Sequence, residues 1–199
     1  MLSRRALLIC AGAALSGCGG QMHGLRRRLG FVVVNERLLL HGVVGRRALA
    51  EFVAVLAENP QIQTIALQDI PDTRDDDVVM AMGQEIRQRG LNTELQSDSD
   101  IAAGGVSLFI AGKERRMVSG AGIHLSSWKD KGVVGSTLPR ESDAHEKRRQ
   151  YVEQMLGSDA FYWFALQAAP EGGIHKMNAQ EIVQYGLLTE PVKVWNEEG

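Results

Sequence analysis

Apolar and polar positions alternate with two different periods along the first two thirds of the chain. Residues 31–34 and 37–44 are short runs of β-branched and apolar residues around a polar pair, which predicts a β-hairpin. In residues 45–59 apolar side chains recur every three or four positions, which predicts an amphipathic helix. Further strands are expected at 64–67, at 92–95 and within 117–125, and further helices at 78–89 and 101–111. This alternation is typical of an α/β domain with a largely parallel sheet.

The last third of the chain is predicted to be helical. Residues 144–156 and 161–168 are expected to form two helices, the second of them rich in aromatic residues. Asn178 is a favourable N-cap for a third helix, which is expected to run through Tyr185 and to end at Gly186. We expect these helices to pack on the sheet.

The first seventeen residues have the pattern of an export signal. Residues 1–5 are short and basic, residues 6–15 are apolar or small, and small residues follow. The apolar stretch is shorter than the roughly 20 residues that a permanent membrane-spanning helix needs. The paired arginines Arg4 and Arg5 resemble a twin-arginine signal only weakly. The pattern predicts a segment that is removed on export.

The quartet Leu15-Ser16-Gly17-Cys18 resembles the lipobox of bacterial lipoproteins. The resemblance implies cleavage before Cys18, a diacylglycerol on its thiol and an acyl chain, such as palmitate, on the new amine. Several acyl chains anchor a protein stably, at about 0.8 kcal/mol per buried methylene. A plain signal that happens to contain a cysteine is the alternative. Gly19 differs from the aspartate of an inner-membrane retention signal, which favours the outer membrane, facing the periplasm, over the inner one.

These features divide the chain into three parts. We expect a signal peptide at 1–17, a lipidated N-terminus with its linker at 18–30, and a single domain at 31–199. The linker ends in three consecutive arginines at 26–28, which favour a solvated segment over contact with anionic lipid headgroups. The formal net charge of −2 gives no general reason to expect nucleic acid as a partner.

The two cysteines restrict the chemistry further. Cys10 would leave with the signal and Cys18 would carry the lipid, so no disulfide can form within one mature chain. A cysteine nucleophile and a thiolate metal site are excluded for the same reason. No two histidines have the spacing of a zinc site.

The order of the predicted elements resembles the superfamily of crotonases and Clp-protease proteolytic subunits, in particular its small exported branch. The resemblance covers roughly residues 36–190 and rests on the phrases at 38–44, 64–67, 86–91 and 178–188. It implies an α/β fold whose largely parallel sheet is flanked by helices, with a helical C-terminal part. A generic α/β domain is the alternative.

The residues that match the peptidase members' catalytic positions have lost the expected chemistry. The resemblance places Ala103 where those members have their serine nucleophile, and alanine has no nucleophilic atom. Residues 68–77 match the glycine-rich oxyanion loop but contain no glycine and several carboxylates. Losing one oxyanion donor typically slows such a reaction about a hundredfold or more. We therefore expect a non-catalytic domain, a pseudo-enzyme that acts in binding or assembly.

A divergent serine hydrolase remains the first alternative. Ser126 stands where the family has its histidine, while His124 lies two residues earlier, on the same face of a strand. Such an enzyme would use Ser107 or Ser126 as the nucleophile with His124 as the base. Coenzyme A is unexpected outside the cytoplasm, and we expect no cofactor.

A calcium-dependent binding module is the second alternative. Asp72, Asp75 and Asp77 belong to an acidic loop, and calcium prefers carboxylate oxygens. Their spacing does not match the twelve-residue calcium loop, which favours a solvated acidic loop. The aromatic run at 161–164 must lie partly in the core, and its remainder would suit a homo-oligomer contact or a protein partner.

Overall fold

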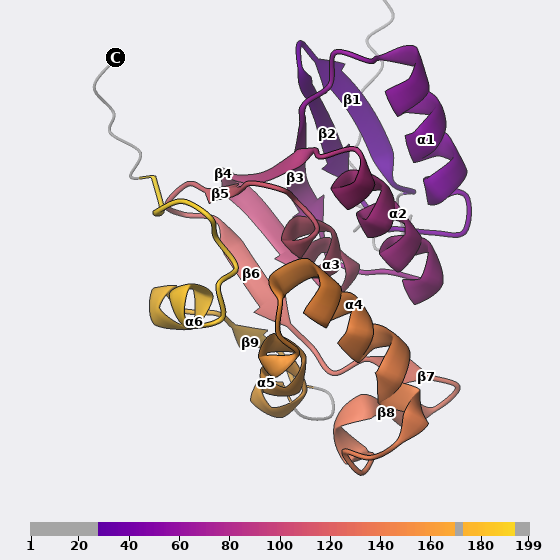
Figure 1. Ribbon diagram of the computed structural model, residues 1–199, viewed down its shortest axis with the longest axis vertical. Coiled ribbons are helices and arrows are strands. Elements are labelled where there is room, and N and C mark those ends of the chain that lie inside the picture. Colours follow the sequence, from indigo (N-terminus) through magenta and orange to yellow (C-terminus); the bar gives the residue numbers. More distant parts are fainter. Residues whose placement is uncertain (1–27, 170–172, 194–199) are drawn as a thin grey trace, which may run out of the picture.

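The computed structural model describes residues 28–169 and 173–193 of the 199-residue chain (Figure 1). The expected signal peptide and Cys18 lie outside the described residues. Within those residues, no helix combines the length and the apolar character needed to cross a membrane.

A mixed sheet forms the centre of the fold (Figure 1). Its strands are β1 (Gly30–Val34), β2 (Arg37–His41), β3 (Thr64–Ile70), β4 (Asn92–Ala102), β5 (Arg115–Met117), β6 (Gly122–Leu125) and β9 (His175–Lys176). They follow the order β1-β2-β3-β4-β6-β9, with β5 paired to β4 as well. Strands β2, β3, β4 and β6 run parallel, and the edge strands β1 and β9 are antiparallel to their neighbours. A separate two-stranded hairpin pairs β7 (Lys129–Asp130) with β8 (Val133–Val134).

The helices lie against this sheet and against one another. They are α1 (Ala48–Glu58), α2 (Asp76–Gln88), α3 (Gly104–Ile110), α4 (Glu146–Leu156), α5 (Ala160–Ala168) and α6 (Ala179–Gln184). Two short 3₁₀ turns, Gly135–Thr137 and Asp143–His145, precede α4. Each helix from α1 to α4 contacts the next one along the chain. The expected α/β fold with a largely parallel sheet and a helical C-terminal part is confirmed.

The core explains why the apolar pattern predicts these elements. In β2 and β3, Leu38, Leu40, Ile65 and Leu67 are fully buried, as expected for strands covered on their faces by helices. Phe52 is the fully buried side chain on the apolar face of α1. Together these side chains belong to one contiguous hydrophobic cluster that includes residues from every helix.

The longest strand differs from its expectation. The apolar pattern predicts a strand at 92–95, whereas β4 continues to Ala102 and α3 begins only at Gly104. Because the second half of β4 is polar, the apolar pattern does not indicate that the strand continues. Ser99 is buried there, where its hydroxyl donates to the Leu67 carbonyl and accepts from the Gln96 N–H. A register shift between Leu67 and Asp69 accommodates the same stretch.

Two other boundaries differ from the expectations. The strand expected within 117–125 is two short strands, β5 and β6, joined by a turn. The packed structure begins earlier than residue 31, because Leu29 is buried and Arg28 forms a β-bridge with Val43. The last residues assigned to the linker therefore belong to the domain.

Candidate functional site

Ala103 lies in a sharp turn between β4 and α3. Its backbone has φ 45° and ψ −115°, a conformation that an L-residue rarely adopts. Residues in such regions typically carry 1–3 kcal/mol of strain, and they cluster at functional sites. A strained strand-to-helix turn of this kind presents the nucleophile in hydrolases. Here the turn is present, and the side chain on it is a methyl group.

The two glycines after Ala103 are required by close packing. A Cβ at Gly104 would lie 2.8 Å from Val79 Cγ2, and a Cβ at Gly105 would lie 3.0 Å from Ile70 Cβ. The turn is therefore clamped between β3 and α2, and its shape does not depend on Ala103 alone.

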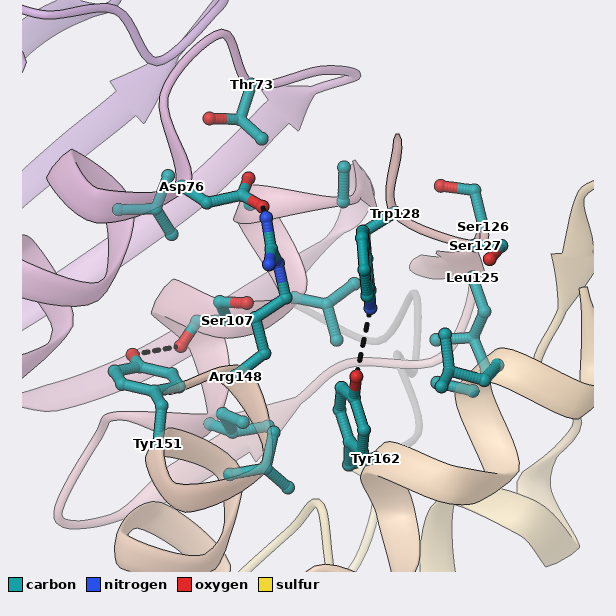
Figure 2. Close-up of a pocket in the computed structure, with 18 of the residues that line it drawn as sticks. Thr73, Asp76, Ser107, Leu125, Ser126, Ser127, Trp128, Arg148, Tyr151 and Tyr162 are labelled. Atoms are coloured by element: carbon teal, nitrogen blue, oxygen red, sulfur yellow. Dashed lines mark hydrogen bonds and ion pairs between the residues drawn. The ribbon is translucent and has the colours of Figure 1, made fainter. Parts of the chain in front are cut away.

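A cavity of about 320 Å³ opens over this turn (Figure 2). We call it the Ala103 cavity. Its walls come from the loop before α2, from α3, from residues 124–129, and from α4 and α5. Its lining combines apolar side chains with a few polar groups, which is the usual character of a ligand site. Its polar groups include those of Asp76, Ser107, Trp128, Arg148 and Tyr162.

Arg148 brings a positive charge into the Ala103 cavity (Figure 2). Its Nε donates to Asp76 Oδ2 at 2.8 Å, and its guanidinium lies 4.2 Å from the centre of the Trp128 ring. The Arg148 side chain is 23% exposed, so part of the guanidinium faces the solvent of the cavity. Asp76 and Trp128 hold this cation in a fixed orientation.

A chain of hydrogen bonds fixes Trp128 and the part of the cavity wall that α5 forms. The Trp128 indole N–H donates to the Tyr162 oxygen at 2.9 Å, and that oxygen lies 2.6 Å from His145 Nδ1. The other ring nitrogen of His145 lies 3.1 Å from the Pro139 carbonyl, which can only accept. Because a carbonyl can only accept, His145 Nε2 carries a proton and donates it to Pro139. Burial raises the pKa of Tyr162, so its hydroxyl stays protonated.

Ser107 lines the cavity from α3. The Tyr151 hydroxyl donates to the Ser107 carbonyl at 2.8 Å, which ties α4 to α3 (Figure 2). Burial strongly raises the pKa of Tyr151, which therefore stays protonated. Gly83 leaves the space for this ring, because a Cβ there would lie 1.8 Å from the Tyr151 oxygen.

His124 borders the Ala103 cavity, and its ring pairs with a carboxylate of β4. Its Nε2 lies 2.6 Å from Asp100 Oδ1. Asp100 alternates along β4 with Ile101, the residue against which α3 packs through Gly105. The His124 ring therefore points to the sheet face opposite α3. Among the hydrogen bonds of the described residues, none joins His124 to Ser107 or Ser126.

The carboxylates of the acidic loop already have partners. Asp72 accepts from the Thr73 N–H at 2.8 Å, and Asp75 caps α2 by accepting from the Val78 N–H. Asp77 pairs with Lys147 at 2.6 Å. No group of three or more histidine, cysteine, aspartate or glutamate side chains that could hold a metal occurs in the part of the chain that the structure describes. Asp72, Asp75 and Asp77 thus stabilise the loop and the start of α2.

The aromatic side chains of residues 161–164 pack against other side chains of the domain. Phe161 and Tyr162 are buried, and Trp163 contacts His145 and accepts the Arg140 guanidinium over its ring. Phe164 stacks on Tyr185 with ring centres 4.3 Å apart. All four rings therefore have intramolecular contacts.

Sequence reasoning missed the residues that shape the cavity. Asp76, Trp128, Arg148 and Tyr162 meet there from four different segments. The signals in the sequence were the acidic stretch 68–77 that contains Asp76, the aromatic run that contains Tyr162 and the arginines of the helix that contains Arg148. None of these signals indicates which side chains meet.

No protein-family model and no curated protein sequence matches the chain. Solved structures do resemble it. A membrane-bound stomatin-specific protease, 1510-N, solved as a mutant, superposes with a TM-score of 0.52 at 15% identity, over 80% of this chain and 78% of that one. An enoyl-CoA hydratase from Thermoplasma volcanium GSS1 superposes with a TM-score of 0.54 at 13% identity, over 85% of this chain and 72% of that one. The domain therefore has a Clp-protease/crotonase-like fold.

Proposed function

We propose that this chain is a lipid-anchored periplasmic protein whose Clp-protease/crotonase-like domain binds a ligand in the Ala103 cavity and does not cleave it. The observation that carries the proposal is Ala103 itself. The strained turn that would expose a nucleophile is retained, and its side chain has no reactive atom. A non-catalytic protein that still binds would keep the cavity and lose only the chemistry.

The surroundings of Ala103 also argue against catalysis. The His124 ring is bonded to Asp100 and faces away from α3, so it is not placed to activate Ser107. Asp72, in the loop before α2, adds a carboxylate to the cavity lining, and a negative charge there would oppose an oxyanion.

The lining of the Ala103 cavity favours a polypeptide segment as its ligand. Val152, Phe161 and Leu166 offer an apolar wall, while Arg148 and Ser107 offer polar groups for a chain that carries carbonyls. One structural neighbour is a protease, which acts on polypeptide. Coenzyme A esters are the less suitable class for a periplasmic protein.

A fluorophosphonate probe tests the absence of catalysis. The probe labels serines that a neighbouring base activates, so we expect no labelling of the full chain beside a known serine hydrolase as positive control. Labelling that Ser107→Ala or Ser126→Ala abolishes would establish the divergent hydrolase in its place.

The anchor is tested on the protein isolated from membranes. We expect its mass to correspond to residues 18–199 with lipid on Cys18, and we expect Cys18→Ser to release the protein into the periplasmic fraction. An unmodified Cys18 thiol on a membrane-bound protein would contradict the proposed anchoring.

A further inference from the structure

A second cavity, of about 540 Å³, is lined by an unusual number of arginines. We call it the cationic cavity. It is lined by Arg28, Arg46, Arg47 and Arg74 together with Glu51 and small or apolar residues. It lies where α1 begins, beside the end of β2 and the loop that follows β3. The Ala103 cavity lies on the other side of that loop, because Thr73 lines one cavity and Arg74 lines the other.

Most of the positive charge in this cavity is not neutralised. Arg28 pairs with Glu51, the only acidic side chain of the lining. In the described part of the chain, no salt bridge joins Arg46, Arg47 or Arg74 to a carboxylate. The whole chain carries a formal charge of −2, so this local excess of cations is not a general property of its surface. Arginine is the side chain best suited to phosphate, which its planar guanidinium contacts through two N–H groups.

The position of the cationic cavity at the N-terminal end of the domain indicates which ligand it binds. Arg28 is the first described residue, and it lines the cationic cavity. Cys18 lies ten residues before it. A chain of that length reaches at most about 35 Å when fully extended, so a lipid on Cys18 keeps the cavity close to the membrane surface. The intervening segment contains Arg26 and Arg27, and like charge makes it a poor occupant of the cavity itself.

We propose that the cationic cavity binds the phosphate headgroups of anionic phospholipids and so seats the domain on the membrane. This inference rests on the proposed anchoring for the identity of the surface, and it concerns a site separate from Ala103. Headgroup binding in this cavity would orient the domain so that the end of the sheet near α1 faces the lipid. The side chains that bind would be those of Arg28, Arg46, Arg47 and Arg74. The acyl chains would then hold the protein at the membrane while the arginines set its orientation.

The test uses the full chain carrying Cys18→Ser, which cannot be acylated, so the result does not depend on whether the natural protein is lipidated. Flotation is measured with vesicles of phosphatidylcholine alone and with vesicles that also contain phosphatidylglycerol, at low and at high salt. We expect binding to the anionic vesicles at low salt only.

Arg46→Glu combined with Arg47→Glu should lower that binding about tenfold or more. The matched control, Lys113→Glu with Lys131→Glu, makes the same change of net charge at exposed sites outside the cavity and should lower binding much less.

Three outcomes would overturn the proposal. Equal binding to neutral and anionic vesicles would show attachment through the apolar signal segment. Equal losses in the two charge-reversal variants would show a response to net charge rather than to this cavity. Inorganic phosphate that raises the melting temperature in an Arg46- and Arg47-dependent way, without any binding to anionic vesicles, would assign the cavity to a small diffusible anion. Failure of the lipid analysis on Cys18, by contrast, would leave the vesicle result unchanged.

Discussion

Ala103 combines two properties that a purely structural alanine does not need. Its positive φ places it in a backbone region that favours glycine, and it lines a cavity. The neighbours Gly104 and Gly105 hold the turn by contacts with Val79 and Ile70. The strain therefore belongs to the architecture of the turn and not to Ala103 alone.

Replacing Ala103 by glycine should stabilise the protein. Glycine adopts φ 45° without the steric penalty, and the relief should exceed the entropy that glycine loses on folding, giving a gain of about 1 kcal/mol. Urea unfolding measures this change. The matched control is Ala102→Gly, one residue earlier in regular strand, which should destabilise by about 0.5–1 kcal/mol. Equal losses in the two variants would mean that the turn at Ala103 carries no strain.

At the scale of single elements, α6 shows how a short helix is held by local chemistry. The Asn178 side chain accepts from the Glu181 N–H, and the Glu181 carboxylate accepts from the Asn178 N–H, which together form a capping box. Glu181 also lies 2.8 Å from His175 Nε2, on the short strand β9. The Asn178 N–H, followed by the His175 ring, lowers the pKa of Glu181 below its ordinary value.

The capping box should make the stability of the protein depend on pH. Because the pKa of Glu181 is lower in the folded state, its stabilising contribution is present above about pH 4.3, the ordinary glutamate value, and is lost as the pH falls through the folded value. Glu181→Gln should therefore be less stable than the natural protein at pH 7, and the difference should shrink toward pH 3. Urea unfolding followed by circular dichroism gives both curves.

The control for this pH effect is Glu58→Gln, at the exposed C-terminal end of α1. This substitution should leave the difference from the natural protein nearly constant with pH. If the free energy of unfolding of Glu181→Gln ran parallel to that of the natural protein from pH 7 to pH 3, the charged Glu181 carboxylate would not be what stabilises the cap.

At the scale of the whole molecule, the buried Arg115 and the half-buried Arg87 join segments that are distant in the sequence. Arg115, on β5, donates to the carbonyls of Leu187 and Gly186 after α6 and to that of Gly112 after α3. Arg87, on α2, donates to the carbonyls of Ile110, Ala111 and Met155 in the same way. Burial lowers the pKa of Arg115, but a guanidinium remains charged at any ordinary pH.

Replacing Arg115 by lysine should destabilise the fold in spite of the retained charge. A single ammonium cannot reach three carbonyls in the fork geometry of a guanidinium, so buried acceptors lose their partners and the loss should be about 2 kcal/mol or more. Urea unfolding measures the total, and amide exchange should show the largest loosening around α6. The neighbouring Arg116→Lys, which changes a half-exposed ion pair with Glu190, should cost less than about 1 kcal/mol. Equal effects of the two substitutions would contradict the role given to Arg115.

Local patterns in the sequence predicted much of the fold and only part of the candidate site. The hairpin, the alternating strands and helices, and the N-cap at Asn178 were predicted, because each depends on residues close together in the chain. The second half of β4 was not, because the polar residues 96–100 carry no apolar alternation and are held by pairing with β3 and β6. His124 and Ser126 lie close together in the sequence, but β6 ends at Leu125, and the His124 ring bonds to Asp100, a partner on β4 that the local sequence does not indicate.

The sequence by itself determined the α/β class, the positions of most elements and the identity of Ala103, since these follow from residue type and short-range periodicity. It also predicts the lipid on Cys18, which lies outside the described residues. Only the tertiary structure decided that Ala103 sits on a strained turn under a cavity, that Arg148 is held there by Asp76 and Trp128, and that four arginines surround a second cavity. Such sites depend on which faces of distant segments are brought together, and the pairing of strands and the packing of helices fix those faces.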